Sequence, residues 1–284
     1  MEQMLSYLGS QSYDLERLKG MGVLDMVSYL QSIPPLPEQE EYSEALKILR
    51  DRKAPGTLPD YDCPVCNNKG FVLDITDDGL EYSRECSCIP KRKSIRYARE
   101  SGLGELLKKR IETFVAAEPW QNQVANVTKQ YIASEKDNWF CMLGQSGCGK
   151  THLCSAIANV FLHLGRQTVY MVWNLAAKEL KQHAMDADYE KLFNRYASAQ
   201  VLYIDDFLKG KITETDLNLA FELLNARYNQ KNLITILSSE LLLTELAQKD
   251  TAIAGRIKER CGSYVIQIGR DPKKNFRFRE EVVL

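Results

Sequence analysis

The eight residues from Gly144 to Thr151 constrain the fold more than any other part of this chain. They read Gly144-Gln145-Ser146-Gly147-Cys148-Gly149-Lys150-Thr151 and match the pattern G-x-x-x-x-G-K-[ST]. This pattern belongs between a strand and a helix. Both neighbours are present, because the apolar run 139–143 precedes the loop and residues 151–164 have a helical pattern. The sequence therefore predicts a strand–loop–helix unit here.

The loop also has the chemistry of a phosphate-binding site. Its glycines allow backbone N–H groups to turn toward anionic oxygens, and the following helix presents its positive N-terminal end to the same anion. Lys150 is expected to reach the β- and γ-phosphates of a nucleotide, and the Thr151 hydroxyl to bind Mg²⁺. We therefore interpret residues 144–151 as the ATP-binding loop.

The chain after residue 138 alternates between strand-like and helix-like segments. Strands are expected at 139–143, 168–173, 201–204, 233–237 and 264–268. Helices are expected at 151–164, 175–199, 216–229 and 241–260, the second with a break near Ala187. This alternation predicts an α/β fold, in which helices cover both faces of a parallel sheet.

Two breaks that contain proline, at 33–37 and 54–59, divide the N-terminal part of the chain. We expect a helical region over residues 1–58, a cysteine module with a basic connector over 59–110, and an ATPase domain over 111–284. A chain of 284 residues with 44% hydrophobic residues can bury the cores of such domains.

Charge and hydropathy exclude several classes of protein. The net charge is −1, so any contact with nucleic acid must come from a local patch rather than from the whole chain. No apolar run approaches the roughly 20 residues of a membrane span. The N-terminus has no basic stretch followed by an apolar run, so it does not resemble a secretory signal. We therefore expect a cytoplasmic protein that binds no membrane.

A pair of carboxylates follows another apolar segment. Residues 201–204 have the pattern of a buried strand, and Asp205 and Asp206 come directly after it. The carboxyl ends of parallel strands line the ligand crevice of such a sheet. We therefore expect Asp205 to organise Mg²⁺ and Asp206 to orient or polarise the attacking water. The alternative is an exposed Asp-Asp turn with no chemical role.

Four of the eight cysteines form a cluster in the sequence. Cys63 and Cys66 make one close pair, and Cys86 and Cys88 make a second. Two such pairs can supply the four thiolates of a tetrahedral zinc site, and clustered cysteines in a reducing compartment more often bind metal than form disulfides. We predict a structural Zn²⁺ site, with free thiols or a redox pair as alternatives. The other four cysteines are expected to be small buried hydrophobes.

Two groups of basic side chains are candidates for contact with DNA. One lies in the connector, at 91–99 and 108–110, and the other lies between the second and third strands of the expected sheet. The second group contains Lys178, Lys181, Lys191 and Arg195. Four aromatic residues lie near it: Trp173, Tyr189, Phe193 and Tyr196. Single-stranded DNA is bound by positive grooves with stacking aromatics. The alternative is that the charges are solvated and the rings pack against the sheet.

The order of these motifs resembles that of the DnaC/DnaI-type replicative helicase loaders, and most of all the phage and Gram-positive versions with an N-terminal cysteine cluster. The resemblance covers about residues 60–284 and rests on the cysteines, the basic connector, the glycine loop, the acidic pair and three further motifs. These motifs are Asn225-x-Arg227-Tyr228, Ser238-Ser239-Glu240 and Arg256-x-x-x-Arg260.

The resemblance implies an AAA+ ATPase that loads a hexameric DnaB-family helicase onto single-stranded DNA. It implies that the N-terminal region contacts the helicase, and that the ATPase domain binds ATP and single strands and forms a homo-oligomer in its ATP-bound state. By the same resemblance, Lys150 and Thr151 belong to the Walker A motif, and Asp205 and Asp206 to the Walker B motif. Glu240 falls at sensor 1. Arg256 and Arg260 fall where the arginines that act on a neighbouring subunit's nucleotide lie.

Three departures from the family pattern carry further expectations. Asp206 stands where Glu is common, and its shorter side chain predicts slow hydrolysis that assembly or DNA would stimulate. Glu240 is an acid where an amide is typical, which changes how sensor 1 can position water. Few residues follow the last expected strand, so we expect no helical lid to carry sensor 2.

Three other functions compete with the helicase loader. A transposase-helper ATPase of the IstB type shares the ATPase core but acts on double-stranded DNA. A small-molecule kinase would need an acceptor-binding lid, and the sequence shows no such insertion. A non-hydrolysing adaptor would use ATP only as a structural switch. The cysteine cluster favours the loader over the transposase helper, and the intact Lys150 and Asp205 favour hydrolysis.

Overall fold

The computed structural model describes residues 54–75, 81–134 and 137–278, and these divide into two units. The described part of the first unit comprises residues 54–58, 63–75 and 81–86. Its strands β1 (Phe71–Ile75) and β2 (Glu81–Glu85) pair in antiparallel fashion. Most of the expected N-terminal helical region lies outside the described residues.

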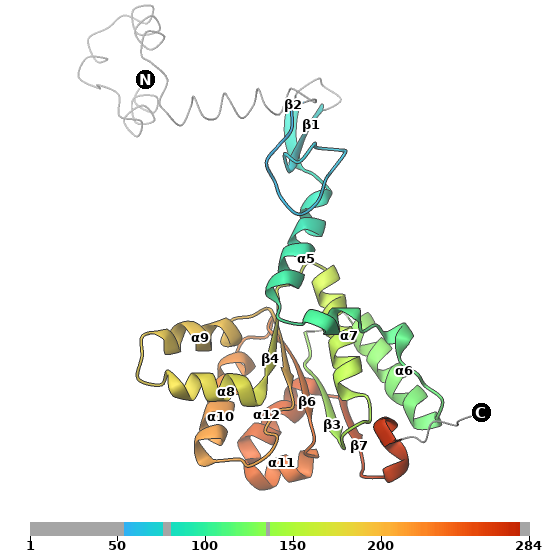
Figure 1. Ribbon diagram of the computed structural model, residues 1–284, viewed down its shortest axis with the longest axis vertical. Coiled ribbons are helices and arrows are strands. Elements are labelled where there is room, and N and C mark those ends of the chain that lie inside the picture. Colours follow the sequence, from blue (N-terminus) through green and yellow to red (C-terminus); the bar gives the residue numbers. More distant parts are fainter. Residues whose placement is uncertain (1–53, 76–80, 135–136, 279–284) are drawn as a thin grey trace, which may run out of the picture. The chain divides into compact units, whose positions relative to one another are not determined.

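A five-stranded parallel sheet forms the centre of the second unit (Figure 1). Its strands are β3 (Phe140–Gly144), β4 (Thr168–Val172), β5 (Val201–Asp205), β6 (Ile234–Ser239) and β7 (Val265–Ile268). Their order across the sheet is β4-β5-β6-β3-β7, so β3, which leads into the glycine loop, lies between β6 and β7. The expected parallel sheet, with the glycine loop directly after one of its strands, is confirmed.

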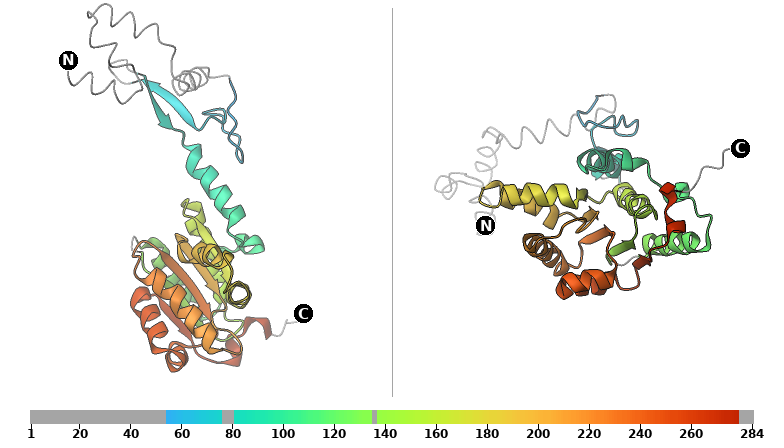
Figure 2. Two further views of the ribbon diagram at one scale, coloured as in Figure 1. Left: turned by 90° about the vertical axis from the view of Figure 1, so that its left-hand side faces the viewer. Right: turned by 60° about the horizontal axis from the view of Figure 1, so that its bottom comes forward.

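Helices cover both faces of this sheet (Figure 2). One face packs against α5 (Cys88–Glu100), α6 (Pro119–Ala133) and α7 (Lys150–His163). The other face packs against α8 (Trp173–Gln182), α9 (Asp188–Ala197), α10 (Glu214–Tyr228), α11 (Leu243–Lys249) and α12 (Thr251–Cys261). Successive strand side chains point to opposite faces. Phe140 and Met142 therefore enter the first core, and Cys141 and Leu143 enter the second.

The segment 241–260, expected as one helix, is two helices. Asp250 has an extended backbone and separates α11 from α12. Its carboxylate accepts hydrogen bonds from the amides of Ala252 and Ile253, which makes it the N-cap of α12. The prediction of one continuous helix was wrong because this cap ends α11 and begins α12. The expected break near Ala187 is confirmed, since α8 ends at Gln182 and α9 begins at Asp188.

The residues before and after the sheet contain short 3₁₀ helices. The connector forms η1 (Gly104–Lys108) and η2 (Ile111–Thr113), and β7 is followed by η3 (Pro272–Lys274) and η4 (Phe276–Phe278). Asn159 of α7 donates hydrogen bonds to the carbonyls of Leu106 and Lys109 at 3.0 and 2.8 Å. These bonds fix the connector on the helix that begins at the glycine loop.

Candidate functional site

The glycine loop joins β3 to α7, as its sequence predicts. Gly144 and Gly149 have positive φ angles of 132° and 93°, which favour glycine. A Cβ atom on Gly144 would lie 2.2 Å from the Ile268 carbonyl oxygen, so no side chain fits where β3 enters the loop. The buried Lys150 ammonium donates to the carbonyls of Gly144 and Gln145 at 2.7 and 2.8 Å. The ammonium of Lys150 therefore lies against the start of its own loop.

Asp205 ends β5 and is surrounded by hydroxyl groups. Thr151 Oγ1 lies 3.3 Å from Asp205 Oδ1, the Tyr170 hydroxyl donates to Oδ2 at 3.0 Å, and the Ser238 hydroxyl also donates to Oδ1. Burial, together with the Asp205 carboxylate, raises the pKa of Tyr170, so Tyr170 remains a neutral donor. Magnesium prefers oxygen ligands. The donors present fit a Mg²⁺ ion that Thr151 and Asp205 would hold.

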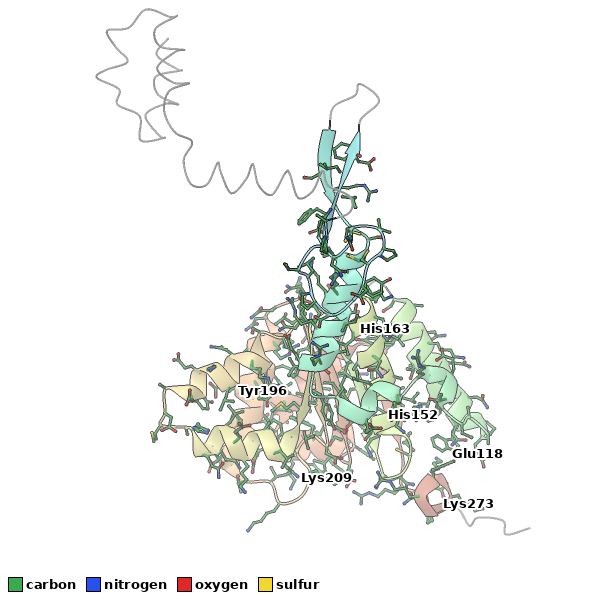
Figure 3. All side chains as sticks on the ribbon, turned by 45° about the horizontal axis from the view of Figure 1, so that its top comes forward. Glu118, His152, His163, Tyr196, Lys209 and Lys273 are labelled. Atoms are coloured by element: carbon green, nitrogen blue, oxygen red, sulfur yellow. The ribbon has the colours of Figure 1, made fainter. Side chains whose placement is uncertain are left out.

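The second acid of the pair adopts an unusual backbone conformation. Asp206 has a φ of 54°, in the left-handed region, and its amide donates to the Ser238 hydroxyl at 3.1 Å. Its carboxylate and that of Glu240 both bind Lys209, whose Nζ lies 3.1 Å from one oxygen of each acid. Figure 3 marks the position of Lys209 on the ribbon. The structure brings the predicted residues Asp206 and Glu240 together. It adds Lys209, which sequence reasoning missed although the residue follows the acidic pair closely.

Residues 146–151 of the loop line a pocket of about 540 Å³ together with Asp206, Lys209 and Glu240. The glycine loop forms its floor, and Asp206, Glu240 and Lys209 lie at one wall. The connector supplies a second wall through Phe114 and Val115. The Phe114 ring packs edge-on against His152, with ring centroids 5.6 Å apart, and such an apolar wall suits a flat nucleobase. No sequence motif marks this wall, because it comes from an irregular segment ahead of the sheet.

Residues after β7 supply a third wall. The Phe276 amide donates to the Gly147 carbonyl at 2.9 Å, and Arg277 Nη1 donates to the Ser146 hydroxyl at 3.2 Å. Gln145 and Asp271 exchange two further hydrogen bonds of 2.7 and 2.6 Å. Phe276 and Arg277 both line the pocket. Arg277 is thus a second basic residue at the loop that sequence reasoning missed.

Comparison with protein families agrees with this geometry. The model of IstB-like ATP binding proteins matches residues 85–273, which include the glycine loop, the acidic pair and Glu240. The chain belongs to this family.

Individual relatives of this IstB-family chain include a phage-like protein. This chain is 32% identical over 237 residues to the phage-like element PBSX protein XkdC of Bacillus subtilis (strain 168), and the match covers 78% of this chain and 87% of XkdC. The chain is also similar to the crystal structure of DnaI, with 22% identity and a TM-score of 0.48 over 61% of this chain and 93% of DnaI. The DnaC helicase loader gives 18% identity and a TM-score of 0.47 over 59% and 99% of the two chains.

The two arginines predicted to act on a neighbouring subunit's nucleotide are bound within their own chain. Arg256 donates to Asn225 Oδ1 at 3.1 and 2.9 Å, and its guanidinium lies 4.5 Å from the Phe221 ring. Arg260 donates to backbone carbonyls, including that of Leu233 at 3.1 Å, and lies 5.4 Å from a Trp139 ring. The described residues that line the ATP pocket include neither arginine. Their action in trans remains a prediction.

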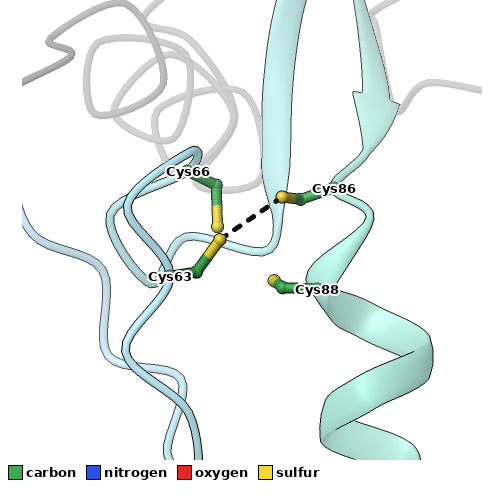
Figure 4. A group of neighbouring side chains, drawn as sticks. All are labelled: Cys63, Cys66, Cys86 and Cys88. Atoms are coloured by element: carbon green, nitrogen blue, oxygen red, sulfur yellow. Dashed lines mark hydrogen bonds between the residues drawn. The ribbon is translucent and has the colours of Figure 1, made fainter.

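The four clustered cysteines come together in space (Figure 4). Their sulfur atoms all lie within 4.8 Å of one another, and all four residues are buried. Cys63 Sγ and Cys86 Sγ are 3.7 Å apart. A tetrahedron with Zn–S bonds of about 2.3 Å has S–S edges of roughly 3.8 Å. The spacing therefore fits zinc, and it requires no movement of this pair of thiols.

Backbone amides donate to sulfur atoms of this cluster, and at Cys63 this favours the thiolate form. The Gly70 N–H donates to Cys66 Sγ at 3.3 Å, and a hydrogen bond from the Cys66 backbone is the main cause that lowers the pKa of Cys63 to about 6. Thiolates are the form that binds metal. The other four cysteines, Cys141, Cys148, Cys154 and Cys261, are buried thiols, as expected.

The aromatic residues considered for stacking on DNA pack against the protein instead. Trp173 is 1% exposed and Tyr196 is 6% exposed. The Trp173 ring meets Phe207 edge-on at 4.9 Å, and the rings of Tyr189 and Phe193 stack on each other 5.8 Å apart. This finding supports the packing alternative. Lys178, Lys191 and Arg195 are exposed, and the partly exposed Lys181 pairs with Asp216 at 2.7 Å, so the basic group itself stays a candidate.

None of the helices within residues 54–75, 81–134 and 137–278 combines the length and the apolar character that a membrane crossing requires.

Proposed function

We propose that this chain is an ATP-hydrolysing loader that delivers a DnaB-family replicative helicase onto single-stranded DNA. The observation that carries the proposal is the assembled four-cysteine cluster ahead of an ATPase domain of the IstB-like family. That cluster is part of the resemblance to the helicase loaders, and a transposase helper would not need it. We expect such a loader to act in the cytoplasm, where replicating DNA is found in bacteria.

The geometry supports hydrolysis through a division of roles among the pocket residues. Lys150 would bind the terminal phosphates, and Thr151 and Asp205 would hold Mg²⁺, which neutralises phosphate charge when bound. Asp206 is the carboxylate left to orient the attacking water, since Asp205 is already surrounded by Thr151, Tyr170 and Ser238. We propose that hydrolysis is slow, because Asp206 is short and is paired with Lys209.

Further parts of the proposal concern assembly and domain roles. The ATP-bound chains would form a homo-oligomer in which Arg256 and Arg260 act on the neighbouring nucleotide. Residues 1–58 would bind the helicase, residues 59–110 would hold a structural zinc, and residues 111–284 would bind ATP and single-stranded DNA. The distances among the four sulfur atoms support the zinc, and the match to an ATP-binding family supports the nucleotide.

The proposal is tested by a helicase-loading assay with the full chain. The replicative helicase of a bacterial host is mixed with the chain, ATP and a primed single-stranded circle, and unwinding of the primer is measured. We expect the chain to co-purify with the helicase and to raise the rate of unwinding at least tenfold. The Lys150→Ala chain should still bind the helicase but fail to stimulate it. No capture of any replicative helicase, together with no stimulation, would contradict the proposal.

A transposase-helper ATPase is the second candidate, because the family model that matches residues 85–273 is that of the IstB-like proteins. The two functions differ in the DNA they bind. Binding of fluorescent single-stranded and double-stranded oligonucleotides of one sequence, measured with a non-hydrolysable ATP analogue present, separates them. Tighter binding to the single strand supports the loader, and tighter binding to the duplex supports the transposase helper.

A further inference from the structure

Lys209 joins the two acids that face the ATP pocket. Its Nζ lies 3.1 Å from an oxygen of Asp206 and 3.1 Å from an oxygen of Glu240, and the three side chains are 34–39% exposed. Partial burial opposes the charge on this lysine. The hydrogen bonds and attraction of Glu240 and Asp206 outweigh that cost and raise the pKa of Lys209 above its ordinary value. Lys209 is therefore a cation that lines the pocket beside the two acids.

A rigid turn sets the position of this lysine. Asp206 and Leu208 both have positive φ angles, 54° and 53°, which residues with side chains rarely adopt. Phe207 and Leu208 are 0% and 2% exposed, so the turn is anchored in the core. The Phe207 amide donates to the Ser238 carbonyl at 2.8 Å. The turn and its anchors place Lys209 where its ammonium reaches both acids while the side chain stays 39% exposed.

The charges around the pocket indicate a role for Lys209. The carboxylates of Asp206 and Glu240 line the pocket in front of the glycine loop, where a triphosphate would add further negative charge. Asp205 is buried beside Thr151 and would pair with Mg²⁺, whereas Glu240 is paired with Lys209. Lys150 already donates to two loop carbonyls. A further cation is needed at the acidic wall, and Lys209 is the residue that both acids hold there.

We infer that Lys209 is a γ-phosphate-binding residue, and that Glu240 positions it by an ion pair. The inference rests on the proposed binding of ATP in this pocket and deepens it. The acid does not contact the nucleotide, and the ammonium that it orients does. The γ-phosphate distinguishes ATP from ADP, so Lys209 would also make the pocket selective for the triphosphate.

The test compares two nucleotides on the full chain. Dissociation constants are measured for Mg²⁺–AMP-PNP and for ADP with wild type, Lys209→Met, Lys209→Arg and Glu240→Gln, and with Lys211→Met, which changes an exposed lysine on the same loop. We expect Lys209→Met to weaken AMP-PNP binding about tenfold or more, the loss of one charge-assisted contact, and to leave ADP binding within about twofold. Lys209→Arg should recover most of the loss.

Glu240→Gln should weaken AMP-PNP binding less than Lys209→Met does, again without an effect on ADP, and the double variant should be no worse than Lys209→Met alone. Lys211→Met should match wild type for both nucleotides. Equal losses for AMP-PNP and ADP in Lys209→Met, or no loss for either, would overturn the inference while the ATP site stands. A wild-type chain that binds neither nucleotide would overturn the ATP site and the inference together.

Discussion

The backbone amide of Phe276 donates a 2.9 Å hydrogen bond to the carbonyl oxygen of Gly147, so the segment after the last strand is attached to the phosphate loop. The next residue, Arg277, donates to the Ser146 hydroxyl and lines the same pocket. A basic residue of the same chain therefore lies at the phosphate loop, although the sequence predicted no lid to carry one.

Arg277→Ala should weaken nucleotide binding moderately. Arg277 is exposed, so its attraction to the phosphates is screened, and we expect a loss of about 3–10-fold in affinity for a fluorescent ATP analogue. Arg270→Ala is the matched control, because Arg270 pairs with Glu245 on the surface. An Arg277→Ala chain that binds the analogue as tightly as the control would show that the segment does not contribute to the site.

Lys150→Ala should abolish tight nucleotide binding. Lys150 is the buried cation of the loop, and without it a bound phosphate would lose its charge-assisted contact with a buried ammonium. We expect at least a 100-fold loss of affinity, in line with removal of a buried charge-assisted contact of about 3 kcal/mol. Circular dichroism should show that the variant remains folded. Unchanged affinity in a folded variant is incompatible with the assigned loop.

One zinc ion should be bound per chain, and it should depend on the clustered cysteines. Metal analysis of the purified protein is expected to give one zinc equivalent, and Cys86→Ser should reduce it to near zero. Cys261→Ala is the control, since this thiol is buried in the ATPase core and should leave the zinc content unchanged. Because the cysteine module has little core, a chelator should also unfold it. Purified protein without zinc would contradict this prediction.

Arg227→Met should destabilise the fold strongly. Arg227 is fully buried and donates to the Thr235 hydroxyl and to four backbone carbonyls, among them those of Ala199 and Ile234. Its loss would leave several buried acceptors unsatisfied, and we expect the free energy of unfolding to fall by about 3–5 kcal/mol. Urea denaturation measures the change. Arg195→Met, at an exposed site, should stay within about 0.5 kcal/mol of wild type.

Hydrolysis should require an arginine from a neighbouring chain. A trans-acting arginine is worth about 10³–10⁵ in rate in related phosphoryl-transfer enzymes. We expect Arg260→Ala to bind ATP without hydrolysing it, and an equal mixture with Lys150→Ala to recover part of the rate through hybrid interfaces. Arg256→Ala is tested in the same way. Because Arg260 also donates to carbonyls of its own chain, the unfolding midpoint of the Arg260→Ala protein must be measured alongside its activity. A wild-type rate in Arg260→Ala alone would refute the role.

The sequence by itself determined the α/β class, the phosphate loop and the acidic pair. These features are local: a glycine pattern between a strand and a helix, and carboxylates at the end of an apolar run, keep their meaning without knowledge of the rest of the chain. The two cysteine pairs are also short-range patterns, and for this reason the sequence predicted the sulfur cluster that the structure assembles.

Only the tertiary structure decided which distant residues complete the pocket. Phe114 comes from a connector ahead of the sheet and Arg277 from the segment after it, and neither carries a motif. Only the structure shows which partners the charged side chains have: Lys209 pairs with Glu240, and Arg256 donates to Asn225. Such pairings depend on how the parallel strands and their connections bring remote parts of the chain to one edge of the sheet, and periodicity along the sequence does not encode them.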